Sequence, residues 1–426
     1  MEELSVAQIK RKRAMYLALS TLSLLFLGLI YAFSMFAAPM SQYFELEKEA
    51  VGLTFNIMMI TFCIGAVVGS QIEKAMGLRT SLLVAAVMFL VGFAGTGLFA
   101  YGNVAMLYLF YGVVAGLGVG IGYNSVIANT NMWFPDKVGF SSGVLMMGFG
   151  VSALVLGNIA LSLVPAAGLS PVLAVLGVLT FVVVCALAFA LSRPPADIVA
   201  RMCPGSAVVA NGVADPAERD APLKTPTFYV YWVWATIVIA IGLATIGNCA
   251  SDAQLVGFDA AFATLLVGIV STFNGFGRVL VGTIYDKTNV KVTMLVDGIV
   301  GVCATVCIIG AFSMGVSALY VVGAICCGFC YGGVPVVASA MSRQRFGSKS
   351  YPLNLSLANF AIVWGSVLNV IVQTVVGGEA RLTIFVVLFV LSILALLDVV
   401  PFSKMWNADM RALDLRRREE TVESDR

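Results

Sequence analysis

The chain has 426 residues, of which 60% are hydrophobic and only 11% are charged, with a net charge of +2 and a mean hydropathy of +0.97. A soluble domain carries about 25% charged residues, so this composition excludes an ordinary soluble protein. The small net charge gives no reason to expect a nucleic-acid partner. Because the sequence has no histidine, it also excludes histidine metal sites and histidine proton relays.

Long apolar runs follow one another along the chain, and each is long enough to cross a bilayer, for which a helix needs about 20 mostly apolar residues. The predicted spans are 14–38, 51–72, 79–100, 104–127, 139–163, 169–192, 227–250, 259–284, 292–313, 316–340, 353–376 and 381–402. The first run lacks a small-residue cleavage site and is interpreted as a span, not as a signal peptide. The sequence therefore predicts an all-α membrane protein with twelve transmembrane helices.

One long polar segment, 193–225, separates the sixth span from the seventh and combines five prolines with glycines and charges, which is typical of a linker. We therefore expect an N-terminal six-helix bundle over 1–192, a linker over 193–225, a C-terminal six-helix bundle over 226–403 and a charged tail over 404–426.

The distribution of Lys and Arg predicts the orientation. With a cytoplasmic N-terminus, 22 of the 25 Lys and Arg fall in cytoplasmic segments, and the exceptions are Lys48, Arg381 and the intramembrane Arg278. Cations favour the side that is not translocated. We expect a multi-pass protein of the cytoplasmic membrane with both termini in the cytoplasm.

The two halves of the chain resemble each other. The segment Gly69–Lys74 after the second span matches Gly282–Lys287 after the eighth at an offset of 213 residues. A repeat in which both halves have the same orientation implies a pseudo-two-fold axis along the membrane normal and is typical of carriers that rock two bundles about a central site.

The segment between Gly116 and Gly150 carries the most informative motif. It reads Gly116-Leu117-Gly118-Val119-Gly120-Ile121-Gly122-Tyr123-Asn124-Ser125, then Asn129-Thr130-Asn131-Met132-Trp133-Phe134-Pro135-Asp136-Lys137, then Ser142-Gly143 and Gly148-Phe149-Gly150. It resembles the oxalate/formate antiporter family of the major facilitator superfamily, a relative of the monocarboxylate transporters. Independently of the resemblance, the four glycines at 116, 118, 120 and 122 predict close helix packing along the fourth span.

The resemblance implies a cytoplasmic gating motif after the second and eighth spans, in which an acid latches one conformation. The candidate gating residues are Glu73, Lys74, Arg79, Asp286, Lys287 and Lys291. The second copy fits the family's spacing. The first copy departs from it, because Glu73 lies four residues before Gly77, where the family has an acid three residues before. We therefore expect a weaker latch in the N-terminal half.

Arg278 is the main candidate for substrate binding. It lies 8 positions before Asp286, about 12 Å from the cytoplasmic loop at 1.5 Å per residue. An arginine at this depth costs several kcal/mol unless it is paired or faces water, and its guanidinium suits a carboxylate. The alternative is that Arg278 snorkels to the cytoplasmic surface or caps a helix end. The acids Asp259, Asp297, Glu379 and Asp398 are expected near span ends.

Two differences between this sequence and the family bear on the expected substrate and on its coupling to protons. Its oxalate carriers use a second cation in the eleventh span, but the stretch Asn354–Ile362 has none, which favours a monoanion. Its proton-linked relatives place an acid where Asn274 stands. With no deep carboxylate expected, exchange or facilitated diffusion is favoured over proton coupling. The candidate substrate-binding residues are Arg278, Tyr31, Tyr123, Tyr331, Asn274 and Asn359, and each tyrosine serves equally well as plain packing.

These observations predict a secondary transporter for a small organic anion such as lactate or formate, acting as an antiporter or facilitator and as a functional monomer. The alternatives are a carrier of the same superfamily for a neutral or cationic solute, and a transporter-like sensor that does not transport. The sequence shows no nucleophile–base pair and no phosphate-cradling loop, so we expect no enzyme activity, no cofactor and no metal.

Overall fold

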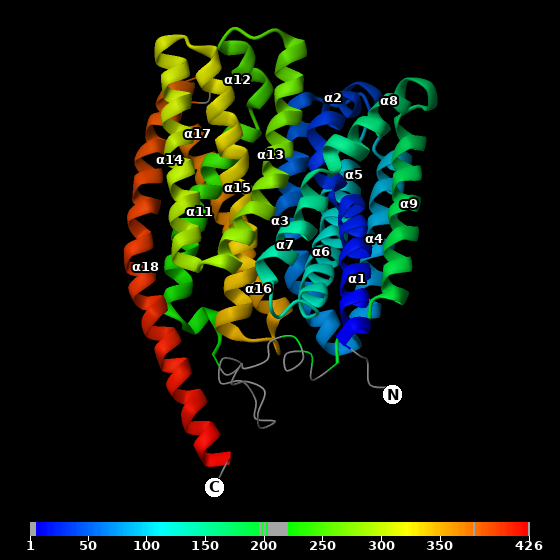
Figure 1. Cartoon of the computed structure of the whole chain (residues 1–426). Coiled ribbons are helices and arrows are strands. Elements are labelled where there is room, and N and C mark those ends of the chain that lie inside the picture. The colour runs from blue at the N-terminus through cyan, green and yellow to red at the C-terminus, as the bar shows by residue number, and fades with distance from the viewer. Residues whose placement is uncertain (1–5, 196–197, 199–201, 203–219, 378–379, 425–426) are drawn as a thin grey trace. The chain divides into compact units, whose positions relative to one another are not determined.

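Helices make up nearly all of the computed structural model, which describes residues 6–195, 198, 202, 220–377 and 380–424 (Figure 1). The α-helices of the first half are α1 (Val6–Leu27), α2 (Phe33–Tyr43), α3 (Lys48–Met76), α4 (Leu78–Phe99), α5 (Val104–Leu107), α6 (Gly116–Asn131), α7 (Val138–Gly150), α8 (Asn158–Ala167) and α9 (Leu169–Ala190). A 3-10 turn, η1 (Gly28–Ala32), follows α1, and the π-helical turns η2 (Tyr108–Ala115) and η3 (Ala153–Gly157) join α5 to α6 and α7 to α8.

In the second half a 3-10 turn, η6 (Pro222–Lys224), leads into the helices α11 (Pro226–Ile246), α12 (Cys249–Leu255), α13 (Ala260–Lys287), α14 (Val290–Met314), α15 (Ser317–Phe346), α16 (Tyr351–Asn359), α17 (Ala361–Val376) and α18 (Arg381–Ser424). Most of the polar segment predicted as a linker lies outside the described residues.

Within the described residues, twelve helical stretches are long and apolar enough to cross a membrane. They are Ala7–Ala32, Ala50–Met76, Leu78–Phe99, Val104–Asn131, Val138–Ala167, Leu169–Ala190, Pro226–Ile246, Ala260–Lys287, Val290–Met314, Ser317–Phe346, Tyr351–Val376 and Arg381–Glu420. Each coincides with one predicted span, so the predicted number and order of spans are confirmed. The largest difference is at the end of the chain, where α18 continues as helix through the polar tail to Ser424.

The described residues form two compact units. The N-terminal unit contains 7–130 and 144–193, whereas the C-terminal unit contains 131–143 and the described residues from 194 onward. The boundary therefore falls inside α7, whose first turn belongs to the C-terminal unit. The functional division into bundles at 1–192 and 226–403 stays a prediction.

Glycines let α6 approach its neighbours in the N-terminal unit. A Cβ atom at Gly116 or Gly120 would collide with α3, at Thr61 Oγ1 and at the Phe62 carbonyl oxygen. A Cβ atom at Gly118 would lie 2.8 Å from Met88 Cβ of α4, and one at Gly122 would lie 2.8 Å from Leu27 of α1. The glycine run therefore occupies crossings on two faces of α6, and its role in sliding stays a prediction.

The C-terminal unit is built around α15, which packs against α11, α13 and α14 and is buried along most of its length (Figure 1). Two of the neighbouring helices, α13 and α14, have side-chain N-caps. Asp259 Oδ1 accepts a hydrogen bond from Phe262 N at the start of α13, at 2.7 Å, and Asn289 Oδ1 accepts one from Val292 N at the start of α14, at 3.0 Å. Such N-caps satisfy backbone donors that the helix itself leaves unpaired.

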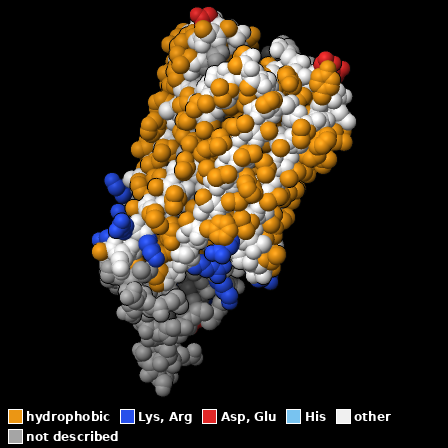
Figure 2. Space-filling view, turned by 90° about the vertical axis from the view of Figure 1, so that its right-hand side faces the viewer, with side chains coloured by type: hydrophobic (Ala, Val, Ile, Leu, Met, Phe, Trp, Pro, Cys, Tyr) orange, Lys and Arg blue, Asp and Glu red, His pale blue; other side chains and the backbone are white. Residues whose placement is uncertain are grey.

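The surface agrees with a membrane environment. On the face drawn in Figure 2, hydrophobic side chains cover the flank, while Lys and Arg gather toward one end and acidic side chains lie at the other. In each unit we call the end where α9 stops or α11 starts the linker end.

Candidate functional site

Arg278 lies inside the membrane-spanning part of α13 and is only 1% exposed. Its Nε donates a hydrogen bond of 3.0 Å to the Asn274 Oδ1, one turn earlier on the same helix. Asn274 is itself buried. The structure therefore brings together two predicted substrate residues, and the amide oxygen fixes the direction of the guanidinium group.

The helix α15 makes room for this pair. A Cβ atom at Gly332 would lie 3.0 Å from Asn274 Oδ1, so only a glycine lets α15 pass this side chain without a shift. The neighbouring Tyr331 is buried, and its Cβ lies against Gly242 of α11. Tyr331 thus packs toward α11, while the next residue along the helix faces the Asn274–Arg278 pair on α13.

Asn359 ends α16 at the break in the eleventh span. Its side chain is buried, and its Nδ2 has no hydrogen-bond partner among the described residues. A buried amide donor without a partner costs free energy, and a ligand or water that accepts from it would recover that cost. This is an observation expected of a binding residue, although its role stays a prediction.

Tyr31 and Tyr123 meet in the N-terminal unit around a phenylalanine that the sequence did not single out. The ring of Phe149 has its centroid 5.2 Å from that of Tyr31 and 4.8 Å from that of Tyr123, both edge to face. Phe62 completes the cluster, 5.2 Å from Tyr123. The two tyrosines therefore form one aromatic cluster within the N-terminal unit.

The second copy of the loop motif is hydrogen-bonded to the start of a helix. Asp286 accepts hydrogen bonds from the backbone N–H of Gly139, at 2.9 Å, and of Phe140, at 2.7 Å, in the first turn of α7. The positive end of a helix dipole stabilises a carboxylate in this position. The backbones also touch here, because a Cβ atom on Gly139 would collide with the Gly282 carbonyl oxygen. Lys287 and Lys291 lie exposed beside this contact.

The first copy is arranged differently. Glu73 is buried in α3 and accepts a hydrogen bond of 2.9 Å from Asn129 Nδ2 of α6. Arg193 NH2 lies 3.8 Å from Glu73 Oε1, and Glu73 Oε2 has no hydrogen-bond partner within the described chain. Arg79 stacks over the Phe189 ring at 5.0 Å, and Lys74 is exposed.

Sequence reasoning missed a buried polar network in the C-terminal unit at the linker end. Asn131 Nδ2 donates to Ser142, at 2.7 Å, and to Ser339, at 3.1 Å, and the Ser339 and Tyr351 hydroxyls are 2.6 Å apart. The network joins the segment 131–143 to α15 and α16. Small hydroxyls within apolar runs gave no signal of their own, although Asn131 belongs to the family motif.

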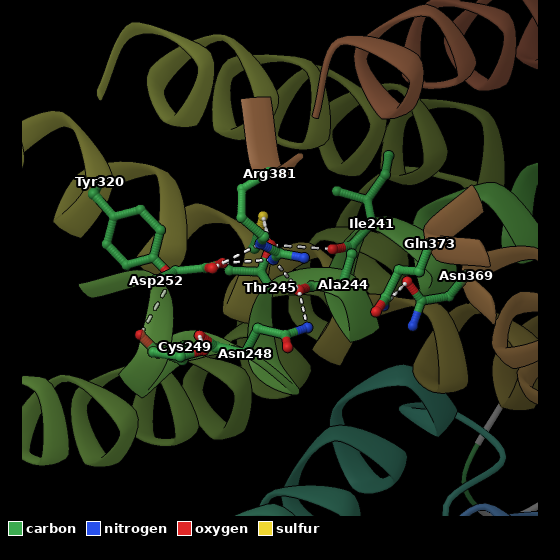
Figure 3. Close-up of polar contacts among 12 residues, drawn as sticks. Ile241, Ala244, Thr245, Asn248, Cys249, Asp252, Tyr320, Asn369, Gln373 and Arg381 are labelled. Carbon is green, nitrogen blue, oxygen red and sulfur yellow. Dashed lines mark hydrogen bonds and ion pairs between the residues drawn. The ribbon is translucent and has the colours of Figure 1, made fainter. Parts of the chain in front are cut away.

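An ion pair at the opposite end of the C-terminal unit was also missed. Arg381, at the start of α18, donates from Nε to Asp252 Oδ1 of α12 at 2.6 Å and from NH2 to the Ala244 carbonyl at 3.0 Å (Figure 3). Both side chains are buried. The available signal was that Arg381 is one of the two cations on the wrong side of the predicted charge distribution.

A second ion-pair network, outside the membrane part, ties the tail of α18 to the unit. Arg345 of α15 donates to Asp220, at 2.8 Å, and to Asp409, at 3.2 Å, and Arg416 also donates to Asp220, at 3.2 Å. Partial burial acts to raise the pKa of Asp220, but the hydrogen bonds from Arg345 and Arg416 outweigh it and hold the pKa below its usual value.

The structure also corrects one expectation. Asp297 was placed near a span end, but it is the eighth residue of α14 (Val290–Met314) and is 0% exposed. At 1.5 Å per residue it lies about 10 Å from the linker end, a depth close to that of Arg278. The expectation that no acid lies as deep as Arg278 is therefore wrong, because α14 begins earlier than its apolar run suggested.

The sequence model of the Major Facilitator Superfamily matches residues 17–368 of the chain. The oxalate:formate antiporter of Oxalobacter formigenes is 27% identical over 285 residues, which cover 67% of this chain and 66% of that protein. The apicoplast pyruvate carrier 1 of Toxoplasma gondii is 37% identical over 93 residues, covering 21% of this chain and 16% of the carrier. The solved structure of the proton:xylose symporter XylE has a TM-score of 0.68 at 14% identity, over 92% of this chain and 96% of that chain.

Proposed function

The chain belongs to the Major Facilitator Superfamily, and on that premise we propose that it is a secondary transporter that moves a small organic anion by alternating access. The fold class predicted from the sequence, an all-α membrane protein with twelve spanning helices and the fold of this superfamily, is confirmed, and so is the resemblance to the oxalate/formate antiporter family.

The observation that carries the proposal is the buried guanidinium of Arg278. It lies deep in a membrane-spanning helix, and Asn274 orients it. A guanidinium presents several donors in a rigid plane and can bind both oxygens of a carboxylate.

The eleventh span supports a monoanion as the substrate. The helices α16 and α17 contain no Lys or Arg, and the polar group that this span offers at its break is the amide of Asn359. One guanidinium and one neutral amide balance a single negative charge better than two. The similarity to an oxalate:formate antiporter and to a pyruvate carrier fits a small carboxylate such as formate, lactate or pyruvate.

The test is binding of radiolabelled formate, lactate and pyruvate to the purified protein, comparing wild type with Arg278→Gln. Loss of a charge-assisted hydrogen bond removes about 1.5–3 kcal/mol, so affinity should fall roughly ten- to two-hundred-fold. Arg411→Gln, which removes an exposed arginine of the α18 tail, is the matched control and should bind as wild type does. Unchanged affinity in Arg278→Gln would refute the role of Arg278.

Two further variants separate charge from geometry. Arg278→Lys keeps the charge and loses the planar fork, so its affinity should lie between those of wild type and Arg278→Gln. Ile362→Lys places a cation in the eleventh span and should shift preference from monoanions toward oxalate. Binding of a neutral or cationic solute instead would identify another kind of carrier, and binding without counterflow in liposomes would identify a sensor.

We also propose that both termini are cytoplasmic, because the cation asymmetry places the linker end on that side. A cysteine introduced at the exposed Ser350, in the loop before α16, should then resist an impermeant thiol reagent in intact cells. Tyr101→Cys, in the exposed loop at the other end of α4, should react. The reverse pattern would overturn the orientation.

A further inference from the structure

Asp297 is a fully buried acid of the C-terminal unit that the site described above does not use. Its side chain is 0% exposed, and neither of its carboxylate oxygens has a hydrogen-bond partner in the described structure. The carboxylate lies directly beside the backbone of α15, since a Cβ atom at Gly333 would come within 2.6 Å of Asp297 Oδ1. A glycine at 333 therefore leaves the space that this carboxyl group occupies.

Two other unpartnered polar groups lie at the same helix junction. Tyr231 and Trp234 of α11 are both fully buried, and neither the Tyr231 hydroxyl nor the Trp234 Nε1–H has a hydrogen-bond partner in the described chain. Their rings are 6.1 Å apart. Trp234 Nε1 lies 3.8 Å from the position of a Cβ atom on Gly298, the residue after Asp297, and Tyr231 interacts electrostatically with Asp297.

The remaining surroundings of Asp297 are apolar or weakly acidic. On α15, the titratable side chain that interacts electrostatically with Asp297 is Cys330. The helix α18 packs on α14 through Leu396 against Gly298, and its acid inside the span is Asp398. The charged residue inside α13 is Arg278, which is oriented by Asn274. In the described part of the chain, Asp297 thus has no cation beside it.

An ionised carboxylate cannot persist in such surroundings. Burying a charge without a partner costs far more than burying a neutral group, and the group takes up a proton instead. We propose that Asp297, Tyr231 and Trp234 form a buried proton-binding site, in which the Asp297 carboxyl group holds a proton in this structure and releases it when water reaches α14.

Release of the proton from Asp297 gives two products, a hydrated proton and a carboxylate. The O–H bond of the carboxyl group breaks, the proton passes to water, and the electron pair stays on the carboxylate. Tyr231 O–H and Trp234 Nε1–H are two donors that can turn to the new negative charge, which would stabilise the ionised form. The site therefore has two states that differ by one charge: a neutral one, in which these polar groups are unpaired as in this structure, and an ionised one with two donors available.

The coupling that this site permits rests on the proposed anion transport. A carrier that binds a monoanion at Arg278 and a proton at Asp297 moves no net charge when both cross together. This reverses the expectation of exchange without protons, which depended on the absence of a deep carboxylate. The protonation itself does not depend on which substrate the protein carries.

Infrared difference spectroscopy of the purified protein tests the protonation directly. At neutral pH the wild type should show the carbonyl stretch of a protonated carboxyl group, and Asp297→Asn, which keeps the size of the side chain, should lose that band. Asp409→Asn is the matched control, because Asp409 is paired with Arg345 and its loss should remove only carboxylate bands. A wild-type spectrum without a band that Asp297→Asn removes would overturn the proposal.

Tyr231→Phe keeps the proposal testable even if Asp297→Asn does not fold. The variant lacks one donor to the ionised form, so the protonated band should persist to higher pH than in the wild type. A purely structural tyrosine would leave the pH of this transition unchanged, and that result would remove Tyr231 from the site.

A transport assay tests the coupling. Proteoliposomes with a trapped pH-sensitive dye and an inward pyruvate gradient should acidify inside, and Asp297→Asn should lose the acidification but keep pyruvate counterflow. Pyruvate entry without proton entry in the wild type would overturn the coupling. Absence of any pyruvate movement would count against pyruvate as the substrate, and the infrared result would still decide whether Asp297 binds a proton.

Discussion

The two copies of the loop motif differ in what their acids hold. Asp286, at the end of α13, accepts from two backbone N–H groups in the first turn of α7. Glu73, near the end of α3, instead accepts from the Asn129 side chain of α6, within its own unit. A similar sequence at a similar place thus produces a contact with a helix end in one half and a side-chain brace in the other.

The two acids occupy the same position in the repeat, because Gly69–Lys74 matches Gly282–Lys287 at one constant offset. The difference therefore lies in what packs against each acid, a side chain of α6 for Glu73 and the first turn of α7 for Asp286. The first turn of α7 belongs to the C-terminal unit, while the rest of α7 belongs to the N-terminal unit. Each contact therefore lies within one unit, that of Asp286 in the C-terminal unit and that of Glu73 in the N-terminal unit.

The largest effect is expected from Asp286→Asn. The variant loses the charge that faces the start of α7, at a cost of about 1.5–3 kcal/mol, which shifts the balance between latched and open forms roughly ten- to two-hundred-fold. The transport rate should fall, while affinity for the anion should change little because Asp286 lies two turns of α13, about 12 Å, from Arg278 and contacts the start of α7 instead. Counterflow in liposomes and equilibrium binding measure the two quantities. A loss of affinity equal to the loss of rate would mean that Asp286 is not a latch.

A smaller effect is expected from Glu73→Gln. The amide still accepts from Asn129, so only the difference between a charged and a neutral hydrogen bond is lost, about 1 kcal/mol or less. The same counterflow assay should show a rate within about five-fold of wild type. If Glu73→Gln and Asp286→Asn were equally damaging, the comparison between the two copies would fail.

Arg193→Gln should have the smallest effect. The Arg193 side chain is 64% exposed and lies 3.8 Å from Glu73, a distance and exposure at which an ion pair adds under about 0.5 kcal/mol. Thermal unfolding in detergent should give the same transition as wild type. A marked destabilisation would show that Glu73 needs Arg193 to remain ionised, and that the brace depends on charge after all.

The sequence predicted the number and order of spans because a membrane imposes one requirement on every spanning helix. Each must carry an apolar run of sufficient length, and such runs are visible without knowledge of packing. Their ends were less accurate, since helices continue past the apolar run into polar residues. The helix α18 runs on to Ser424, and α14 begins at Val290, two residues before its predicted span, which makes Asp297 the eighth residue of the helix.

The candidate site was predicted only in part, for a physical reason. Arg278 and Asn274 were both predicted as substrate residues, and they meet because they lie one turn apart on one helix. Asp252 and Arg381 are 129 residues apart, and Asn131 and Ser339 are 208 apart, so no local pattern relates them. Phe149 and Phe62 were missed because a phenylalanine in an apolar helix looks the same at a helix crossing and against lipid.

The pair formed by Asp252 and Arg381 has a consequence for how the protein is made. Asp252 is synthesised 129 residues before Arg381, the first residue of the last helix. Until α18 is inserted, the carboxylate of α12 has no guanidinium to neutralise it, and an unpaired buried charge is strongly destabilising. A chain that terminates before α18 should therefore be degraded by the quality-control proteases of the membrane. It lacks Arg381, which neutralises Asp252 in the C-terminal unit.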